Sequence, residues 1–322
     1  ATDGDGTNSG AGKTKPAGYP SINDMLAGAK QMASDVMGMG YHELWDQKDV
    51  EPYPGYEYAK NHIRYLFTLE DGGDNPWGMT KADNKEFIFY KVFDFTLKQT
   101  RRNIQHSKPV TPLRKLMDMY LCTDGLPVQH SPLFEGYDSM TSEFKNRDLR
   151  LVGLVDEPLS KDWGWGLGTD GGGAQFGVPF EESGVDFHYT YIPNLENPGV
   201  ERNMGYSGRK FVSQHRGRET SESSMNYPLI RLAEVYLIYA EATYELDGAI
   251  SDADLDLTIN KIRERSGVGP LTNAMVGTYA DLNMLGEIRR ERAIELFGEG
   301  YRLQDLLRWG IAEDELNRTH CT

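Results

Sequence analysis

Residues 227–242 read YPLIRLAEVYLIYAEA, and this stretch opens the most strongly helical part of the chain. Core-type side chains recur here at the three- and four-residue spacing that places them on one face of a helix. They are Leu232, Val235, Tyr236, Tyr239, Thr243 and Leu246. Asp247-Gly248 should end this helix, since glycine takes the left-handed conformation of a C-terminal cap at little cost.

The residues that follow predict further helices. A second helix is expected over about 252–266, ended by Gly267. With the first helix it would form a hairpin of about the length of a tetratricopeptide repeat. A third helical stretch covers about 281–309, and we expect it to break at Gly298 or Gly300.

The residues before this helical part follow a less regular pattern. A helix capped by Ser21 is predicted over about 21–45, and the β-branched and aromatic content of 86–95 predicts a strand. A short helix is expected over 111–120. Frequent Gly, Asp, Ser and Pro in 123–225 predict long loops with a few short strands. Loops of this length are often functional.

The sequence as a whole therefore predicts a mainly α protein, with helical hairpins, a loop-rich face and a few short strands. We expect a single domain of 322 residues. Its flexible lead would be 1–20, its irregular ligand-binding region 21–225, and its helical-repeat part 226–322.

Composition excludes several classes of function. The formal net charge is −15, whereas a nucleic-acid binder usually carries a basic surface to meet phosphates. We predict no nucleic-acid partner, and anionic polymers are disfavoured for the same reason, while neutral ligands are not. The two cysteines, Cys122 and Cys321, form no CxxC pair and favour no zinc site. We predict no metal and no cofactor; the pairing state of the cysteines stays open.

Four blocks of the C-terminal third closely resemble the SusD/RagB family and occur in that family's order. They are YPLIRLAEVYLIYAEA at 227–242, INKIRERSG at 259–267, IRRERAIEL at 288–296 and GEGYRLQDLLRWG at 298–310. Two weaker blocks, PLRKLMDMY at 112–120 and NRDLRL at 146–151, extend the resemblance upstream.

This resemblance implies a fold and a role. The fold would be SusD-like, with tetratricopeptide-type hairpins. The role would be that of a lipid-anchored nutrient-binding protein on the extracellular face of the outer membrane, passing oligosaccharides to a SusC-like TonB-dependent transporter. Members of the family are usually longer and begin with a lipidated cysteine and several helices, so we expect this sequence to be a portion of a longer protein.

The charged residues of the C-terminal blocks favour structure over catalysis. Arg and Glu or Asp recur three residues apart, where they can pair along a helix, as in Arg292/Glu295, Glu299/Arg302 and Asp305/Arg308. The seven histidines are dispersed, and the chain has neither an HExxH nor a GxSxG motif. We therefore predict no catalytic residues.

Aromatic side chains in the loops are the candidate sugar-binding residues. A flat aromatic ring offers an apolar platform for the C–H face of a sugar. In WGWG at 163–166, Trp163 and Trp165 alternate with glycine on accessible backbone, and Tyr189 and Tyr191 would share one face of a strand. Trp77, in a turn-rich stretch, completes the set. Core packing is the alternative for each of these five rings.

Three rival functions remain. A RagB-like relative could bind peptides on the same fold, although the pair Trp163 and Trp165 weighs against it. A helical-repeat scaffold would bind only another protein and would bury the aromatic loop in that interface. A hydrolase would release product from a polysaccharide; the 49 acidic residues make a pair of carboxylates available by chance and so decide nothing.

Overall fold

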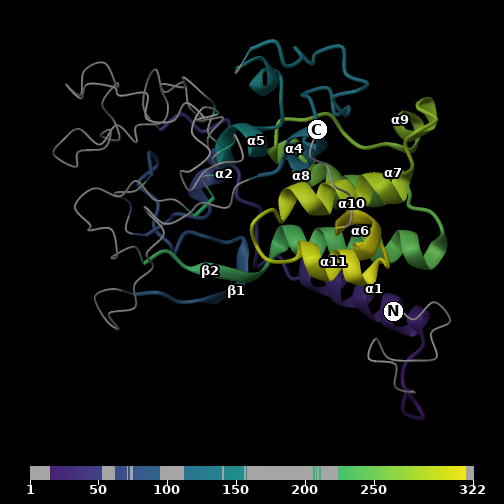
Figure 1. Cartoon of the computed structure of the whole chain (residues 1–322). Coiled ribbons are helices and arrows are strands. Elements are labelled where there is room, and N and C mark those ends of the chain that lie inside the picture. The colour runs from purple at the N-terminus through teal and green to yellow at the C-terminus, as the bar shows by residue number, and fades with distance from the viewer. Residues whose placement is uncertain are drawn as a thin grey trace, which may run out of the picture. The chain divides into compact units, whose positions relative to one another are not determined.

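The structure is a computed structural model (Figure 1), and its helices and strands form two compact units. It describes residues 15–52, 62–70, 72, 75–94, 112–139, 141–155, 157, 206, 208, 210–211 and 224–316. The first of the two units, the helical unit, comprises Ala1–Gly40, Ala233–Ile259 and Leu271–Thr322. The second, the mixed unit, comprises Tyr41–Leu232 and Asn260–Pro270.

The helical unit contains most of the helices in the described part of the chain. They are α1 (Ile22–Gly38), α6 (Leu232–Asp247), α7 (Asp252–Leu257), α9 (Asn273–Thr278), α10 (Met284–Glu295), α11 (Arg302–Arg308) and α12 (Ala312–Leu316). This order confirms the prediction of a mainly α fold with helical hairpins. None of the helices within the described ranges is long and apolar enough to cross a membrane.

The first helix begins as the sequence predicts. Ser21 accepts a hydrogen bond of 3.1 Å from the backbone N–H of Asp24, and Asp24 accepts one of 3.1 Å from the N–H of Ser21. This reciprocal capping box satisfies two N–H groups that a helix end leaves unbonded. The helix ends at Gly38 rather than near residue 45, and Gly40 then turns the chain with a φ of +68°.

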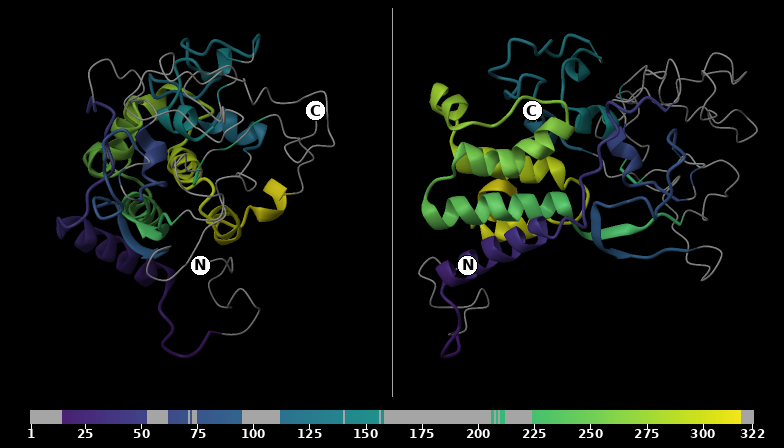
Figure 2. Two further views of the ribbon diagram at one scale, coloured as in Figure 1. Left: turned by 90° about the vertical axis from the view of Figure 1, so that its left-hand side faces the viewer. Right: turned by 180° about the vertical axis from the view of Figure 1, so that it is seen from behind.

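α6 is the central helix of the helical unit, with α1, α10 and α11 alongside it (Figure 2). Ion pairs join it to each neighbour. Lys30 of α1 lies 3.0 Å from Asp247, Arg289 of α10 lies 3.3 Å from Glu245, and Arg308 of α11 pairs with Glu241. Burial on most sides of α6 explains why its sequence is apolar around nearly its whole circumference.

Glycines stop the helices where the sequence predicts. Gly248, Gly267, Gly298 and Gly300 all have positive φ, between +67° and +91°. The expected single helix over 252–266 is instead two, because Thr258, with φ −131° and ψ −92°, separates α7 from α8 (Ile259–Arg265). The Thr258 hydroxyl donates a 2.6 Å hydrogen bond to the Asp254 carbonyl, as threonine side chains do when they compete with the helix.

The predicted i,i+3 ion pairs of the last helices are confirmed for one pair. Arg308 Nε donates a 2.9 Å hydrogen bond to Asp305 on α11. Asp305 also accepts a 2.8 Å bond from Arg292 of α10, so the same carboxylate joins two helices.

The mixed unit is organised around a two-stranded antiparallel sheet. β1 (Phe87–Lys91) confirms the strand predicted over 86–95, and it pairs with β2 (Tyr227–Arg231) in a register that aligns Phe87 with Arg231 and Lys91 with Tyr227. The short helices of this unit are α2 (His62–Tyr65), α4 (Arg114–Met119), the 3₁₀ helix η2 (Ser142–Phe144) and α5 (Leu149–Leu154). α4 confirms the helix predicted over 111–120.

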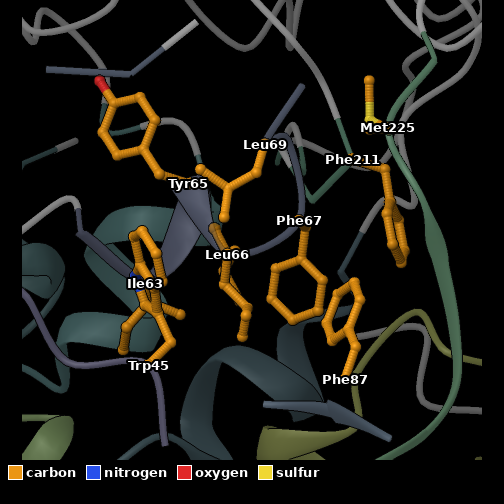
Figure 3. Packing of buried hydrophobic residues seen from close by; sticks show 10 residues of the cluster. Trp45, Ile63, Tyr65, Leu66, Phe67, Leu69, Phe87, Phe211 and Met225 are labelled. Carbon is orange, nitrogen blue, oxygen red and sulfur yellow. The ribbon is translucent and has the colours of Figure 1, made fainter. Parts of the chain in front are cut away.

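An aromatic-rich core holds the mixed unit together (Figure 3). Phe67 lies at its centre, with ring centroids 6.2 Å from Phe87 and 5.3 Å from Phe211. The cluster of buried residues is Trp45, Ile63, Tyr65, Leu66, Phe67, Leu69, Phe87, Leu154, Phe211 and Met225. Segments far apart in the sequence thus meet in one core.

Candidate functional site

The sequence-predicted sugar-binding residues divide into two groups. Trp163, Trp165, Tyr189 and Tyr191 lie outside the described residues. Trp77 lies within them, in the mixed unit. The structure gives the surroundings of Trp77, whereas the other four residues are proposed from the sequence alone.

Trp77 is half-buried against the aromatic core. Its ring meets Trp45 edge-to-face with centroids 6.3 Å apart, and Tyr65 in the same manner at 5.5 Å. The indole N–H donates a 2.7 Å hydrogen bond to the carbonyl of Val50. Such contacts fix the orientation of the ring, which is what packing requires and also what a rigid sugar platform requires.

Glu86 is the centre of a buried ion set that orders the mixed unit. Arg231 Nη1 lies 2.7 Å from one carboxylate oxygen, and Arg265 Nη1 lies 2.6 Å from the other. The backbone N–H of Trp45 donates a further bond of 2.8 Å. All three charged side chains are almost fully buried, so solvent and ligands do not reach them, and their role is structural.

A second charged group, the Arg114 cluster, is open to solvent. It consists of Arg114, Asp118, Tyr137, Glu143 and Tyr206. The Arg114 guanidinium lies 3.9 Å from the Tyr137 ring centroid and reaches Asp118 at 2.8 Å and Glu143 at 2.9 Å. It also donates to the Tyr206 hydroxyl. Each tyrosine donates in turn, Tyr137 to Asp118 at 2.9 Å and Tyr206 to Glu143 at 3.0 Å.

Local sequence explains how these side chains converge. Arg114 and Asp118 are four residues apart on α4 and so lie on one face of it. Gly136, with a φ of +75°, turns the loop immediately before Tyr137. The hydroxyl of Ser142 donates to the Gly136 carbonyl at 3.0 Å, which ties that loop to η2 and thus to Glu143.

The electrostatics of the cluster keep both tyrosines protonated near neutral pH. Burial, and then the charge of the Glu143 carboxylate, raise the pKa of Tyr206. Burial and a hydrogen bond to Asp118 raise the pKa of Tyr137. One guanidinium faces two carboxylates, so the cluster has a net charge of −1. It can offer hydroxyl groups, carboxylate acceptors and one exposed ring to a polar ligand.

Sequence reasoning did not single out this cluster. The segment 111–120 is predicted as a short helix and as part of the family resemblance, but not as a site, and Tyr137 stands alone in its loop rather than in a repeated aromatic pattern. The signal present in the sequence is the i,i+4 pair Arg114 and Asp118, an ordinary helical ion pair that carries no mark of a site. Tyr206 is 92 residues from Arg114, a separation that no local pattern bridges.

The described part of the chain contains no group of three or more His, Cys, Asp or Glu side chains placed to hold a metal ion. The polar side chains of the C-terminal block 298–310 make structural contacts, as Trp309 shows. Its indole N–H donates to Glu241 at 2.6 Å, and the Arg308 guanidinium lies 4.9 Å from its ring centroid. These contacts are of the structural kind that the sequence predicts for this block.

Comparison with known proteins supplies the class of protein. The SusD family model matches residues 94–320. Among curated proteins, the SusD-like protein P25 of Formosa agariphila is 32% identical over 134 residues, covering 41% of this chain and 21% of the relative.

Solved structures agree in fold. A SusD-like carbohydrate-binding protein from Bacteroides fragilis is 21% identical, with a TM-score of 0.57, over 90% of this chain and 50% of its own. A structure with a xylogluco-oligosaccharide is 16% identical, with a TM-score of 0.53, over 93% of this chain and 48% of its own.

These observations define the class first: a mainly α protein with a SusD-like fold. The family match then covers well over half of the sequence, and the chain belongs to the SusD family. The chain spans about half the length of the similar solved structures, and its match covers about a fifth of the curated relative.

Proposed function

We propose that this protein binds oligosaccharides without altering them and delivers them to a SusC-like TonB-dependent outer-membrane transporter. The observation that carries the proposal is the SusD family match over residues 94–320. A similar structure is that of a carbohydrate-binding protein, and another contains a xylogluco-oligosaccharide. The absence of HExxH and GxSxG motifs from the sequence supports a binding role rather than a catalytic one.

The proposal includes a location and a set of contact residues. The protein would act on the extracellular face of the outer membrane, lipid-anchored in its full-length form. Trp163, Trp165, Tyr189, Tyr191 and Trp77 would supply rings for the C–H faces of the sugar. A net charge of −15 supports neutral over anionic glycans, because anionic chains would be repelled.

Affinity gel electrophoresis through gels that contain single soluble polysaccharides tests the binding step. We expect retardation of the wild-type chain by a neutral glycan, and loss of that retardation when Trp163→Ala and Trp165→Ala are combined. Tyr41→Ala is the matched control, since Tyr41 is 78% exposed and belongs to no candidate site. A parallel reducing-end assay should detect no new ends.

Other outcomes would select a rival. Release of reducing ends would indicate a hydrolase. If no glycan retards the wild-type chain, a peptide-binding or scaffold function replaces the proposed one. Co-purification of the full-length protein with its SusC-like transporter tests the delivery step, and a protein that never co-purifies would contradict it.

A further inference from the structure

We propose that the Arg114 cluster is a subsite for one neutral sugar residue, with the Tyr137 ring as its platform and Asp118 as its hydroxyl acceptor. This inference rests on the proposed glycan-binding function. It assigns a place and a ligand charge to part of that function. It involves none of the five aromatic residues proposed from sequence.

The Tyr137 ring has the properties of a platform. Tyr137 as a whole residue is 52% exposed, although it carries a large aromatic side chain. It is also held still, because the Arg114 guanidinium lies 3.9 Å from its centroid and Phe134 meets it edge-to-face at 5.0 Å. Its hydroxyl is fixed by the 2.9 Å bond to Asp118. A ring that is ordered before binding loses little conformational entropy when a ligand stacks on it.

Polar groups beside the ring can recognise hydroxyls. An ionised carboxylate has about four lone-pair positions. In Asp118, one oxygen accepts from Tyr137 and from Arg114 Nη2, and the other accepts, among the residues that the structure describes, from Arg114 Nε alone, at 3.3 Å. Its side chain is 39% exposed, so the second oxygen can accept a further bond from a sugar hydroxyl. Hydrogen bonds to a charged acceptor are stronger than those to a neutral one.

Glu143 has a different task in the same cluster. Its side chain is only 11% exposed and accepts bonds from Arg114 at 2.9 Å and from Tyr206 at 3.0 Å. It therefore neutralises and orients the guanidinium from the buried side, and we place it as a positioning residue. Arg114, whose side chain is 43% exposed, is thereby held against the tyrosine ring at the surface.

The charge of the cluster selects the class of sugar. Two carboxylates face one guanidinium, so the fork of Arg114 is already engaged by Asp118 and Glu143. An incoming uronate or sulfate would have to displace one of these carboxylates or approach a site that is already negative by one charge. A neutral sugar meets neither obstacle and can use the carboxylate as an acceptor.

A structural role accounts directly for the buried side of the cluster. The ion pair between Arg114 on α4 and the buried Glu143 on η2 is enough to join these two helices. The bond from Tyr137 to Asp118 joins two side chains on the exposed side, and the tie between α4 and η2 does not require it. The exposed half of the cluster is accordingly the part that we assign to ligand binding.

The test compares four variants in gels of neutral polysaccharides (xyloglucan, starch, galactomannan, arabinoxylan) and anionic ones (polygalacturonate, dextran sulfate). Tyr137→Ala should weaken retardation by the neutral glycan about tenfold, the loss expected for one stacking platform. Tyr137→Phe keeps the ring and should weaken it less than about threefold. Asp118→Asn should weaken it by about fivefold. The control Tyr41→Ala should have no effect.

The outcomes separate this inference from the function on which it rests. If wild type and Tyr137→Ala are retarded equally by a neutral glycan, the subsite is overturned and the glycan-binding function stands. If the wild-type chain binds none of the six polysaccharides, both are overturned. Tighter binding of an anionic glycan than of any neutral one would overturn the charge assignment. Matching circular dichroism spectra of Tyr137→Ala and Tyr137→Phe show that a loss of binding is not a loss of fold.

Discussion

Arg265 donates a hydrogen bond of 2.6 Å from Nη1 to Oε2 of Glu86, 179 residues away in the sequence, and both side chains are almost completely buried. Arg231 binds the other carboxylate oxygen at 2.7 Å. The carboxylate therefore joins the strand β2 and the end of α8 to the start of β1. A buried charge pair adds little net stability, but removal of one partner leaves the remaining buried charges in a medium that solvates charge poorly.

We accordingly expect Glu86→Ala to lower the free energy of unfolding by about 3–5 kcal/mol, because two buried guanidinium groups would lose a carboxylate partner. Urea unfolding followed by tryptophan fluorescence measures this change. Glu43→Ala is the matched control in the same unit: Glu43 pairs with Lys85 at 3.1 Å, but its side chain is 65% exposed, so the cost should be below about 1 kcal/mol. Equal effects of the two substitutions would contradict the structural role of Glu86.

His62 makes the mixed unit sensitive to acid. Burial lowers the pKa of its imidazole from 6.5 to about 4, although the charge of Asp46 acts in the opposite direction. Nδ1 accepts a 3.2 Å bond from the N–H of Gln47, and Nε2 lies 3.2 Å from the Arg265 carbonyl, to which it can donate. The neutral ring with its proton on Nε2 satisfies both contacts, whereas protonation of Nδ1 would remove the first.

The sign of the pH effect follows from proton uptake. Between pH 6.5 and about 4 the unfolded chain binds a proton at this residue and the folded chain does not, so stability falls as the pH is lowered through that range. The contribution of this one group is at most about 1.4 kcal/mol per pH unit. Urea unfolding midpoints between pH 7 and 4 should decline less steeply for His62→Gln than for wild type. Parallel curves would show that His62 does not titrate in this way.

Local signals predicted the helices of this chain better than its sheet. Ser21, Gly248 and Gly267 act through their immediate neighbours, and all three lie where the sequence places them. The partner of β1 was not predicted, since β2 contains Pro228 and runs directly into α6. Proline is unfavourable in a central strand, but in the described part of the chain this sheet has two strands, and each is an edge.

The candidate site shows the same limit more strongly. Periodicity could not bring Tyr206 to Glu143, because the contact depends on how segments 63 residues apart pack. Composition favoured tryptophans beside glycines, and so it selected Trp163 and Trp165 over the single Tyr137. The sequence therefore predicted that aromatic side chains would form a sugar site. It did not predict that Tyr137 would pack against Arg114 beside the carboxylates of Asp118 and Glu143.

Trp77 should contribute to stability whatever it contributes to binding. Trp77→Ala removes two edge-to-face contacts and the bond from the indole N–H to Val50, and we expect a loss of about 3 kcal/mol. Trp77→Phe keeps a ring but not the N–H donor, and should lose about 1–2 kcal/mol. Thermal unfolding measures both. If Trp77→Ala unfolds at the wild-type temperature, the ring does not support the core.

A close approach of two backbone segments gives the last prediction. Gly125 and Gly269 lie where the segment after Leu121 passes the end of α8, and the N–H of Gly269 donates a 2.9 Å bond to the Thr123 carbonyl. A Cβ atom on Gly269 would stand 2.5 Å from the backbone oxygen of Asp124, and that backbone cannot rotate away as a side chain could. Gly269→Ala should therefore cost about 1–3 kcal/mol of stability.

Gly28→Ala is the matched control for this substitution. Gly28 lies inside α1, and a Cβ atom there would meet nothing within 4 Å. Alanine also costs less conformational entropy than glycine in a helix, so this variant should gain about 0.5–1 kcal/mol. The two substitutions add the same methyl group and should shift the urea midpoint in opposite directions. Shifts in the same direction would mean that the packing of Gly269 against Asp124 does not decide the outcome.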